Sequence, residues 1–385
     1  MGKFDNTNTS IIIILLILNI GYIAVFPLGN VMLTYIFRIP ALALIVLMIV
    51  RTYKFSRPQY KFSLMLFGLI CLINIIRMKE VFTFDLFLSI FSVFCLLFLV
   101  IVSSAIKTTL KLQRGIYIVS LFAALVMTIH YFMPYAHLAR MHDGTLFYAI
   151  YLTFGFGNSN FAGIIAFLIY CSIWISARYK SFWNRMITLA CSGWMLYMIY
   201  ETNCRSALAA AILVPLGTIL FKKIKLKKIF IYLACSIPFL FVPFYINLAK
   251  DTDVNIEIMG KGMISGREKV YANFLDHLNS LTDWMVGTFD NSPFDNAHNG
   301  PLSIFISVGI IGCICFFHII INRLIRYNKT AISHTAKAAV FSIIAIFIES
   351  CGEASLFLGG FPSIIFIFLF FVLADSNGRP KAKAY

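Results

Sequence analysis

The chain has 385 residues, of which 60% are hydrophobic and only 12% are charged, and its formal net charge is +16. A soluble chain of this length would usually form two or three domains, but here apolar runs of about 17–25 residues recur, each long enough to cross a membrane. Basic loops beside a membrane usually face anionic lipid headgroups. The composition therefore predicts one integral membrane domain over residues 1–385, and it argues against binding of nucleic acid.

Twelve apolar runs follow one another along the chain. They cover about residues 11–27, 31–50, 62–76, 81–103, 115–133, 160–177, 186–201, 204–221, 229–246, 300–321, 337–350 and 360–374. Runs that are joined as closely as the seventh and eighth must form helical hairpins. We therefore expect an all-α polytopic membrane protein with about 12 transmembrane helices.

The positive charges alternate between the gaps that separate these runs. Of the 32 Lys and Arg residues, 23 lie in one set of alternate gaps and at the two termini, eight lie in the other set, and Arg38 lies inside a run. Under the positive-inside rule, the first set and both termini are cytoplasmic. The two longest segments, 134–159 and 247–299, then lie on the extracytoplasmic face, and residues 247–298 hold eight of the 16 acidic residues.

The segment 247–299 contains a helix start that can be recognised from its sequence. Ser265-Gly266-Arg267-Glu268 matches a capping box, and we expect an amphipathic helix behind it on the outer face. Its apolar stripe consists of Val270, Phe274, Leu278 and Leu281. Free amides and a guanidinium in the first turn suit a diphosphate. The alternative is that Arg267 pairs with a loop acid such as Asp276 or Asp283, and the residues alone leave both open.

Three further helices are expected to begin on the same outer face. Their starts are Asn158-Ser159-Asn160, Arg205-Ser206 and His298-Asn299-Gly300-Pro301. Each supplies capping side chains and the positive end of a helix. Such a start is more often an ordinary cap than a site, but capping alone does not account for Arg205, Arg267 and His298 on one face. The candidate substrate-binding residues are Asn158, Asn160, Ser206, Ser265, Asn299 and Arg38.

Two of these candidates need separate comment, as does the question of a metal. His298 suits proton transfer because the unperturbed pKa of histidine is near neutral. Arg38 needs a partner or a wet cavity inside the membrane; it either lines a cleft for an anionic headgroup or extends to the interface. Asp251-Thr252-Asp253 is similar to a metal-binding DxD motif, but two acids in a loop are a weak match. We therefore expect no metal and no cofactor.

These segments, in this order, resemble the O-antigen ligase and O-antigen or capsular polysaccharide polymerase (Wzy-type) superfamily. The matching pieces are Asn158-Ser159-Asn160-Phe161-Ala162, Thr202-Asn203-Cys204-Arg205-Ser206, Ser265-Gly266-Arg267, Ala297-His298-Asn299 and Val308-Gly309-Ile310-Ile311-Gly312. The similarity covers about residues 155–320. The departures from the family pattern are Cys204, Tyr271, Gly287-Thr288-Phe289 and Pro301.

The resemblance implies a C-type glycosyltransferase-like helical fold in the cytoplasmic membrane of a bacterium, with 247–299 as its catalytic loop. The family's donors are glycans on undecaprenyl diphosphate. A flippase delivers them, and a chain-length regulator is a usual partner. By motif, Arg205 and Arg267 correspond to the family's essential arginines and His298 to its essential histidine.

The same residues suit transfer of a glycan from a lipid diphosphate. Positive charge from Arg205 and Arg267 would stabilise the departing diphosphate, while His298 would accept a proton from the attacking hydroxyl. We therefore expect a metal-independent polymerase that inverts the anomeric carbon and builds a capsule, exopolysaccharide or O-antigen. A ligase that moves the glycan to another acceptor is the nearest alternative. A flippase or transporter should carry polar residues through several spans, whereas here the polar candidates gather outside.

Overall fold

The structure is a computed structural model, and it describes twelve helices of 14 residues or more together with shorter elements. The described residues are 2–29, 31–52, 60–77, 84–140, 146–177, 181–221, 226–250, 257–258, 261–262, 270–271, 278, 280–288, 299–353 and 361–375. The long helices are α1 (Gly2–Val25), α2 (Val31–Thr52), α3 (Lys61–Arg77), α4 (Phe84–Val102), α5 (Leu110–Tyr131), α6 (Ser159–Ser176), α7 (Phe182–Glu201), α8 (Arg205–Leu220), α9 (Lys228–Lys250), α12 (Gly300–Thr330), α13 (His334–Glu349) and α15 (Phe361–Ala374). Each of the twelve predicted runs falls within one of them or extends beyond its ends by a few residues.

The shorter elements lie between these helices. They are the 3-10 helices η1 (Phe26–Leu28), η4 (Ser103–Ala105) and η5 (Pro134–His137), the strands β1 (Leu138–Arg140), β2 (Leu146–Tyr148), β3 (Glu257–Ile258) and β4 (Lys261–Gly262), and the helix α11 (Leu281–Val286). Strand β1 pairs antiparallel with β2, and β3 pairs in the same way with β4. In the described part of the chain, these two small hairpins and one isolated bridge between Ala139 and Gly157 are the departures from an all-α fold.

The helices have the length and composition of membrane spans. Among the described residues, six helices are long and apolar enough to cross a membrane, and three more are apolar but shorter. Apolar side chains also cover the outside of the helical body, as at Met32 of α2, Phe62 and Met65 of α3, and Phe230 and Phe244 of α9. Water would disfavour such a surface, whereas lipid accepts it. The chain is therefore an all-α membrane protein.

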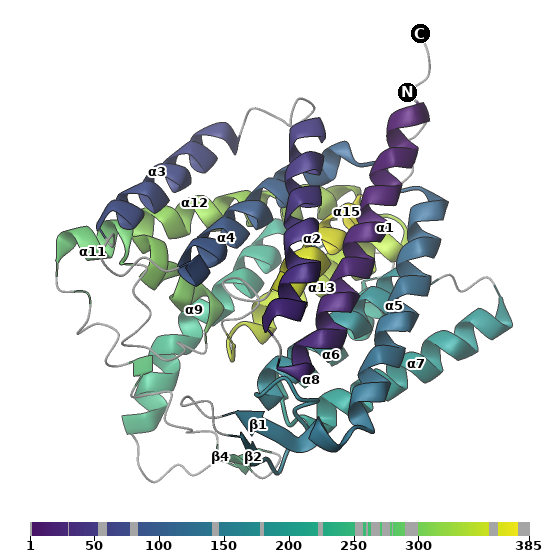
Figure 1. Ribbon diagram of the computed structural model, residues 1–385. Coiled ribbons are helices and arrows are strands. Elements are labelled where there is room, and N and C mark those ends of the chain that lie inside the picture. The colour runs from purple at the N-terminus through teal and green to yellow at the C-terminus, as the bar shows by residue number, and fades with distance from the viewer. Residues whose placement is uncertain are drawn as a thin grey trace.

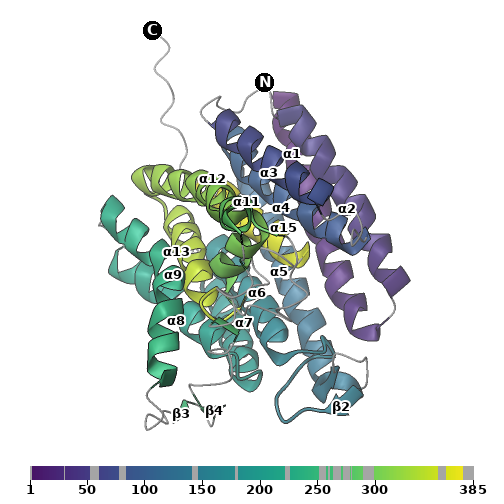
Figure 2. The ribbon, with the colours of Figure 1, turned by 90° about the vertical axis from the view of Figure 1, so that its left-hand side faces the viewer.

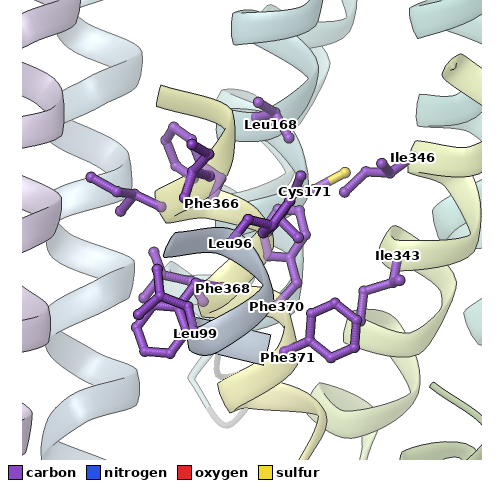
Figure 3. Packing of buried hydrophobic residues seen from close by; sticks show 14 of the residues in the cluster. Leu96, Leu99, Leu168, Cys171, Ile343, Ile346, Phe366, Phe368, Phe370 and Phe371 are labelled. Carbon is purple, nitrogen blue, oxygen red and sulfur yellow. The ribbon is translucent and has the colours of Figure 1, made fainter. Parts of the chain in front are cut away.

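The centre of the helical body is α15. Every residue of this helix is buried, and α1, α4, α6 and α13 pack around it. Figure 3 shows phenylalanine side chains of α15 interleaved with aliphatic side chains of its neighbours, such as Leu96 of α4, Leu168 of α6 and Ile343 of α13. A helix that is apolar on every side is expected where other helices surround it completely.

Polar side chains inside the body join one helix to another. Gln113 of α5 donates from Nε2 to Oγ1 of Thr335 at 2.9 Å, and the hydroxyls of Ser120 and Ser172 are 2.6 Å apart. Asn19 of α1 donates to the carbonyl of Pro362 at 3.3 Å. Hydrogen bonds of this kind strengthen helix association where lipid offers no alternative partner.

The two hairpins lie at one end of the molecule. Figures 1 and 2 both show β1–β2 and β3–β4 at the end opposite to the start of α1. We call this the hairpin end. The two longest segments between apolar runs, which were predicted to share one face, therefore both contribute elements to the same end of the molecule.

Candidate functional site

The start of α6 carries two of the predicted site residues. Asn158 is the N-cap, and its Oδ1 accepts from the backbone amide of Asn160 at 2.8 Å. The side chain of Asn160 makes a different contact, because its Nδ2 donates to Oε1 of Glu353 at 2.6 Å. Asn158 is exposed, while Glu353 is buried. Asn158 thus caps α6, and Asn160 connects α6 to the chain that follows α13.

A tight turn between α7 and α8 places Arg205. Asn203 adopts a positive φ of 53° in this turn, a conformation that asparagine tolerates better than most residues. Gly163 of α6 lies directly against the turn, and a Cβ built there would be 2.4 Å from the Cβ of Cys204. Because Gly163 has no side chain, the start of α8 can touch α6. Arg205, the first residue of α8, is half-buried at this contact.

The first turn of α8 faces a buried carboxylate. Ser206 donates from Oγ to Oε1 of Glu349 at 3.5 Å. Glu349 is the last residue of α13 and is 0% exposed, and Glu353 is only 3% exposed. Both carboxylates also act electrostatically on the thiol of Cys204, the residue before Arg205. Two acidic side chains are therefore buried beside the start of α8.

The start of α12 reaches the same place. Asn299 is the N-cap of α12, and its Oδ1 accepts from the amide of Leu302 at 2.9 Å. Its Nδ2 donates to the carbonyl of Pro238 in α9 at 3.0 Å, so both ends of this buried amide bind protein. The next residue, Gly300, donates from its backbone amide to the carbonyl of Ser350 at 2.9 Å.

Three helix N-termini thus meet the C-terminal end of α13. α6 reaches it through Glu353, α8 through Glu349 and α12 through Ser350. We call these three residues the α13 hub. Helix N-termini carry positive partial charge and a helix C-terminus carries negative partial charge, so the arrangement is electrostatically complementary. The structure brings together Asn160, the Arg205-Ser206 pair and the helix start that follows Asn299.

Sequence reasoning overlooked the two glutamates of the hub. Half of the acidic residues lie in 247–298, where the catalytic loop was predicted. Glu349 ends an apolar helix and Glu353 follows it, and both fall outside that region. An ionisable residue at the end of an apolar span is costly to bury and is usually functional. Two of them four residues apart, at the end of an apolar run and just after it, are a signal that could have identified the hub.

Arg38 belongs to a different set of described contacts from the hub. It is half-buried on α2, and its described electrostatic neighbour is Tyr22 of α1. Its Nε is buried and has no hydrogen-bond partner among the described residues. The structure therefore places this predicted substrate-binding residue between α1 and α2, in a different group of contacts from Asn160 and Ser206.

The remaining candidates, Ser265, Arg267 and His298, lie outside the described residues. The same is true of most of the amphipathic helix expected behind Ser265. Its expected C-terminal part is wrong, because Leu278 lies outside any helix and Leu281 begins a separate helix, α11. Leu281 is also 79% exposed, so it does not continue a buried stripe.

The separate helix has a capping box of its own. Ser280 and Asp283 cap each other's backbone amides at the start of α11, which explains why a new helix begins here. Asp283 also forms an ion pair with Arg77 of α3, with Arg77 Nη2 2.5 Å from its Oδ1. Partial burial alone would raise the pKa of Asp283, but hydrogen bonds from Ser280 and Arg77 and the charge of Arg77 outweigh it and lower the pKa.

The described parts of 270–288 pack against the helical body. Tyr271 is buried and lies 5.7 Å from Tyr245 of α9, measured between ring centroids, and Trp284 lies 5.7 Å from Phe305 of α12. Trp284 also donates from Nε1 to the carbonyl of Leu278 at 3.1 Å. The predicted loop is thus held against α9 and the first part of α12.

No protein-family model matches the chain, and a search of curated proteins finds no match.

Proposed function

We propose that this protein is a membrane polysaccharide polymerase. It joins oligosaccharide repeat units, carried on undecaprenyl diphosphate, at the outer face of the cytoplasmic membrane of a bacterium. The product is a capsule, exopolysaccharide or O-antigen. The observation that carries the proposal is the convergence of the starts of α6, α8 and α12 on the α13 hub, because these starts belong to three of the five segments that resemble the polymerase and ligase superfamily.

The convergence suits binding of a lipid diphosphate. Amides at a helix N-terminus bind phosphate oxygens, and a preorganised positive charge stabilises the diphosphate as it leaves the sugar. Arg205 stands at such a helix start. In this proposal Arg205 binds the departing diphosphate, and Asn158 and Ser206 line the same binding region.

The charge of the hub indicates why a second arginine is needed. Arg205 stands near two buried carboxylates, those of Glu349 and Glu353. One guanidinium beside two carboxylates does not offset a diphosphate, so further positive charge must come from elsewhere in the chain. Arg267 is our candidate for that charge, with Ser265 beside it as the cap.

The transfer itself is a single displacement. A hydroxyl of the acceptor sugar attacks the anomeric carbon of the donor, the bond to the diphosphate oxygen breaks, and the anomeric configuration inverts. His298 accepts the proton of the attacking hydroxyl. The arginines take the place of a metal ion, so neither a metal nor another cofactor takes part in the proposed reaction.

The proposal also includes the number of membrane spans, the type of fold and the orientation in the membrane. We propose about twelve membrane spans in a C-type glycosyltransferase-like fold, with both termini in the cytoplasm and the hairpin end outside. Residues 247–299 form the extracytoplasmic catalytic loop. Membrane lipids surround the body, a flippase supplies the donor, and a chain-length regulator is a further partner.

A transporter of the same lipid-linked glycan is the alternative from another class. Buried polar side chains such as Asn19, Gln113 and Ser120 do occur within the helices, but the structure uses them to join helices to one another. This use in helix packing is what favours the enzyme over the transporter in our proposal. A ligase differs from a polymerase only in its acceptor, and the experiment below separates the two.

The experiment uses purified full-length protein in liposomes with one undecaprenyl-diphosphate oligosaccharide as both donor and acceptor. Products are resolved by size for wild type, Arg205→Ala, Arg267→Ala and His298→Ala. Arg114→Ala serves as the matched control, because Arg114 is exposed on α5. We expect a ladder at repeat-unit spacing that persists in EDTA, is retained in the control, and falls by roughly 100-fold or more when an oxyanion-binding group is lost.

Each other result has a distinct meaning. A product that forms only after another acceptor is added would identify a ligase. Transfer of the lipid-linked glycan across the bilayer without any new glycosidic bond would identify a transporter. Loss of the ladder in EDTA would contradict metal-independent catalysis, and full activity of Arg205→Ala would remove the hub from the mechanism.

A further inference from the structure

Two polar side chains of α3 bind the backbone at the end of α11 and directly after it. Asn74 is fully buried, and its Nδ2 donates to the carbonyl of Val286 at 2.5 Å and to the carbonyl of Ser307 at 3.2 Å. One turn further on, Arg77 donates to the carbonyl of Gly287 at 2.9 Å and pairs with Asp283. We call Asn74, Arg77 and Asp283, with the backbone they hold, the α3 latch. Figure 1 shows α11 beside α3 and α12.

The latch closes on a break in α12. Gly309 has φ 64° and ψ −173° inside this helix. Carbonyls in the preceding turn therefore lose their regular hydrogen bonds to the backbone amides four residues further along the chain. Two of them have partners from outside α12: the carbonyl of Ile306 accepts from the amide of Thr288 at 2.9 Å, and that of Ser307 accepts from Asn74. An unpaired backbone carbonyl is unfavourable in a membrane because no water can bind it, so these contacts stabilise the break.

Two glycines allow the backbones to meet at this point. A Cβ at Gly287 would lie 2.5 Å from the carbonyl carbon and oxygen of Ser307, and a Cβ at Gly309 would lie 2.4 Å from those of Met285. Both positions have positive φ. Gly287 and Gly309 belong to segments already compared with the superfamily, and the structure shows that the two segments touch each other.

The latch and the hub hold opposite ends of one short piece of helix. The first part of α12, residues 300–308, begins where Gly300 donates to Ser350 of the hub, and it ends at the carbonyls held by Thr288 and Asn74. The residue before Asn299, which caps this piece, is His298. The angle of this piece therefore depends on α3 as well as on α13.

From these contacts we infer that Asn74 and Arg77 are positioning residues for the transfer reaction. By fixing residues 283–288 and the break in α12, they orient residues 300–308 and thereby the chain that leads into Asn299. The inference rests on the proposed function, because it assigns the latch to the same reaction. Displacement of a reacting group by about 1 Å can lower a rate by ~100-fold, so a residue that touches no substrate can still control turnover.

The test reverses the two charges of the latch separately and together. Arg77→Asp and Asp283→Arg each place like charges in contact, whereas the double variant restores an ion pair of opposite direction. In the liposome assay we expect each single variant to lower kcat by roughly tenfold or more, with KM within about twofold of wild type. The double variant restores opposite charges but neither the hydrogen bond to Gly287 nor the cap at Ser280, so it should regain part of that kcat. The unchanged KM separates loss of positioning from loss of folded protein or of substrate binding.

Two further variants keep the test decisive. Lys61→Asp reverses a charge at the opposite, exposed end of the same helix and should leave kcat unchanged. Arg77→Lys keeps the charge but loses the fork that reaches both Asp283 and Gly287, so an intermediate kcat is expected even if Arg77→Asp does not fold. Wild-type kcat in the single variants, or a double variant as slow as the singles, would overturn the inference. Inactive wild type would instead overturn the proposed function.

Discussion

The two glutamates of the α13 hub make different contacts although they lie only four residues apart. Glu349 is reached by a hydroxyl at 3.5 Å, whereas Glu353 is reached by the amide of Asn160 at 2.6 Å. Hydrogen bonds to oxygen weaken as the distance between donor and acceptor grows beyond about 3.2 Å. The contact between Glu353 and Asn160 is therefore the firmer described link between α6 and the hub.

Replacement of Glu353 should separate the effect of its charge from that of its hydrogen bond. Glu353→Gln keeps an oxygen that accepts from Asn160, so we expect a loss of about 1 kcal/mol in the free energy of unfolding. Glu353→Ala leaves the half-buried amide of Asn160 without this acceptor and should cost about 2 kcal/mol. Unfolding curves in detergent would measure both variants.

The matched control for this comparison is Glu201, the half-buried last residue of α7. Its carboxylate interacts with the exposed Tyr197 rather than with the hub, so Glu201→Ala should cost less in the free energy of unfolding than Glu353→Ala. If Glu353→Ala unfolds at the same point as wild type, the contact with Asn160 contributes nothing to stability.

Among the elements, α12 depends most on its neighbours. Its break at Gly309 is stabilised by α3 and by the residues that follow α11, while its start is held by α9 and α13. A helix break needs an identifiable cause, and here the cause is a backbone-to-backbone contact that only two glycines permit. The apolar pattern of 300–321 is uninterrupted across the break and contains no sign of a change in direction.

Substitution of Gly309 by alanine should therefore disrupt this part of the fold. The Cβ would clash with the carbonyl of Met285, and the required φ and ψ are essentially restricted to glycine. We expect Gly309→Ala to lower the free energy of unfolding by more than about 3 kcal/mol, since both strain and lost hydrogen bonds contribute. Thermal unfolding and the yield of monodisperse protein would measure the effect.

Gly193 of α7 provides the opposite case. Nothing lies within 4 Å of a Cβ built at this position, and alanine is the better helix former. Gly193→Ala should leave the free energy of unfolding unchanged or raise it by about 0.5–1 kcal/mol. Equal losses in Gly193→Ala and Gly309→Ala would mean that the contact at the break is not responsible.

For the whole molecule, the positive-inside pattern makes a prediction about orientation. The hairpin end should be extracytoplasmic and the basic gaps cytoplasmic. Tyr148→Cys places a thiol on the hairpin, where the native side chain is 73% exposed, and Lys227→Cys places one in an exposed basic gap. A membrane-impermeant maleimide should label the first in intact cells and the second only after permeabilisation.

The native cysteines should contribute little background labelling to this measurement. Eight of the nine are buried and the ninth, Cys191, is half-buried, so the background should be low and can be measured in wild type. Labelling of Lys227→Cys in intact cells, with Tyr148→Cys protected, would reverse the orientation and place the proposed site on the wrong side for an external donor.

What the sequence alone could determine was local. Each of the twelve apolar runs corresponds to a helix, because a span must satisfy its backbone within itself and so leaves a continuous apolar stretch. The helix starts at Asn158 and Asn299 could also be predicted, because a cap needs only one polar side chain and a few backbone amides nearby in sequence. The capping box of α11 follows the same local rule, although the prediction placed a capping box at Ser265 and none here.

The tertiary structure alone decided which of these local features meet. Glu353 contacts Asn160 across 193 positions of the chain, and Arg77 pairs with Asp283 across 206. No pattern within either segment specifies such a partner, because the contact depends on how α3, α6, α12 and α13 pack. The same packing put Arg38 of α2 beside Tyr22 of α1 and turned α12 at Gly309. Short-range hydrogen bonding determined the elements, and the close approach of distant backbones determined the candidate site.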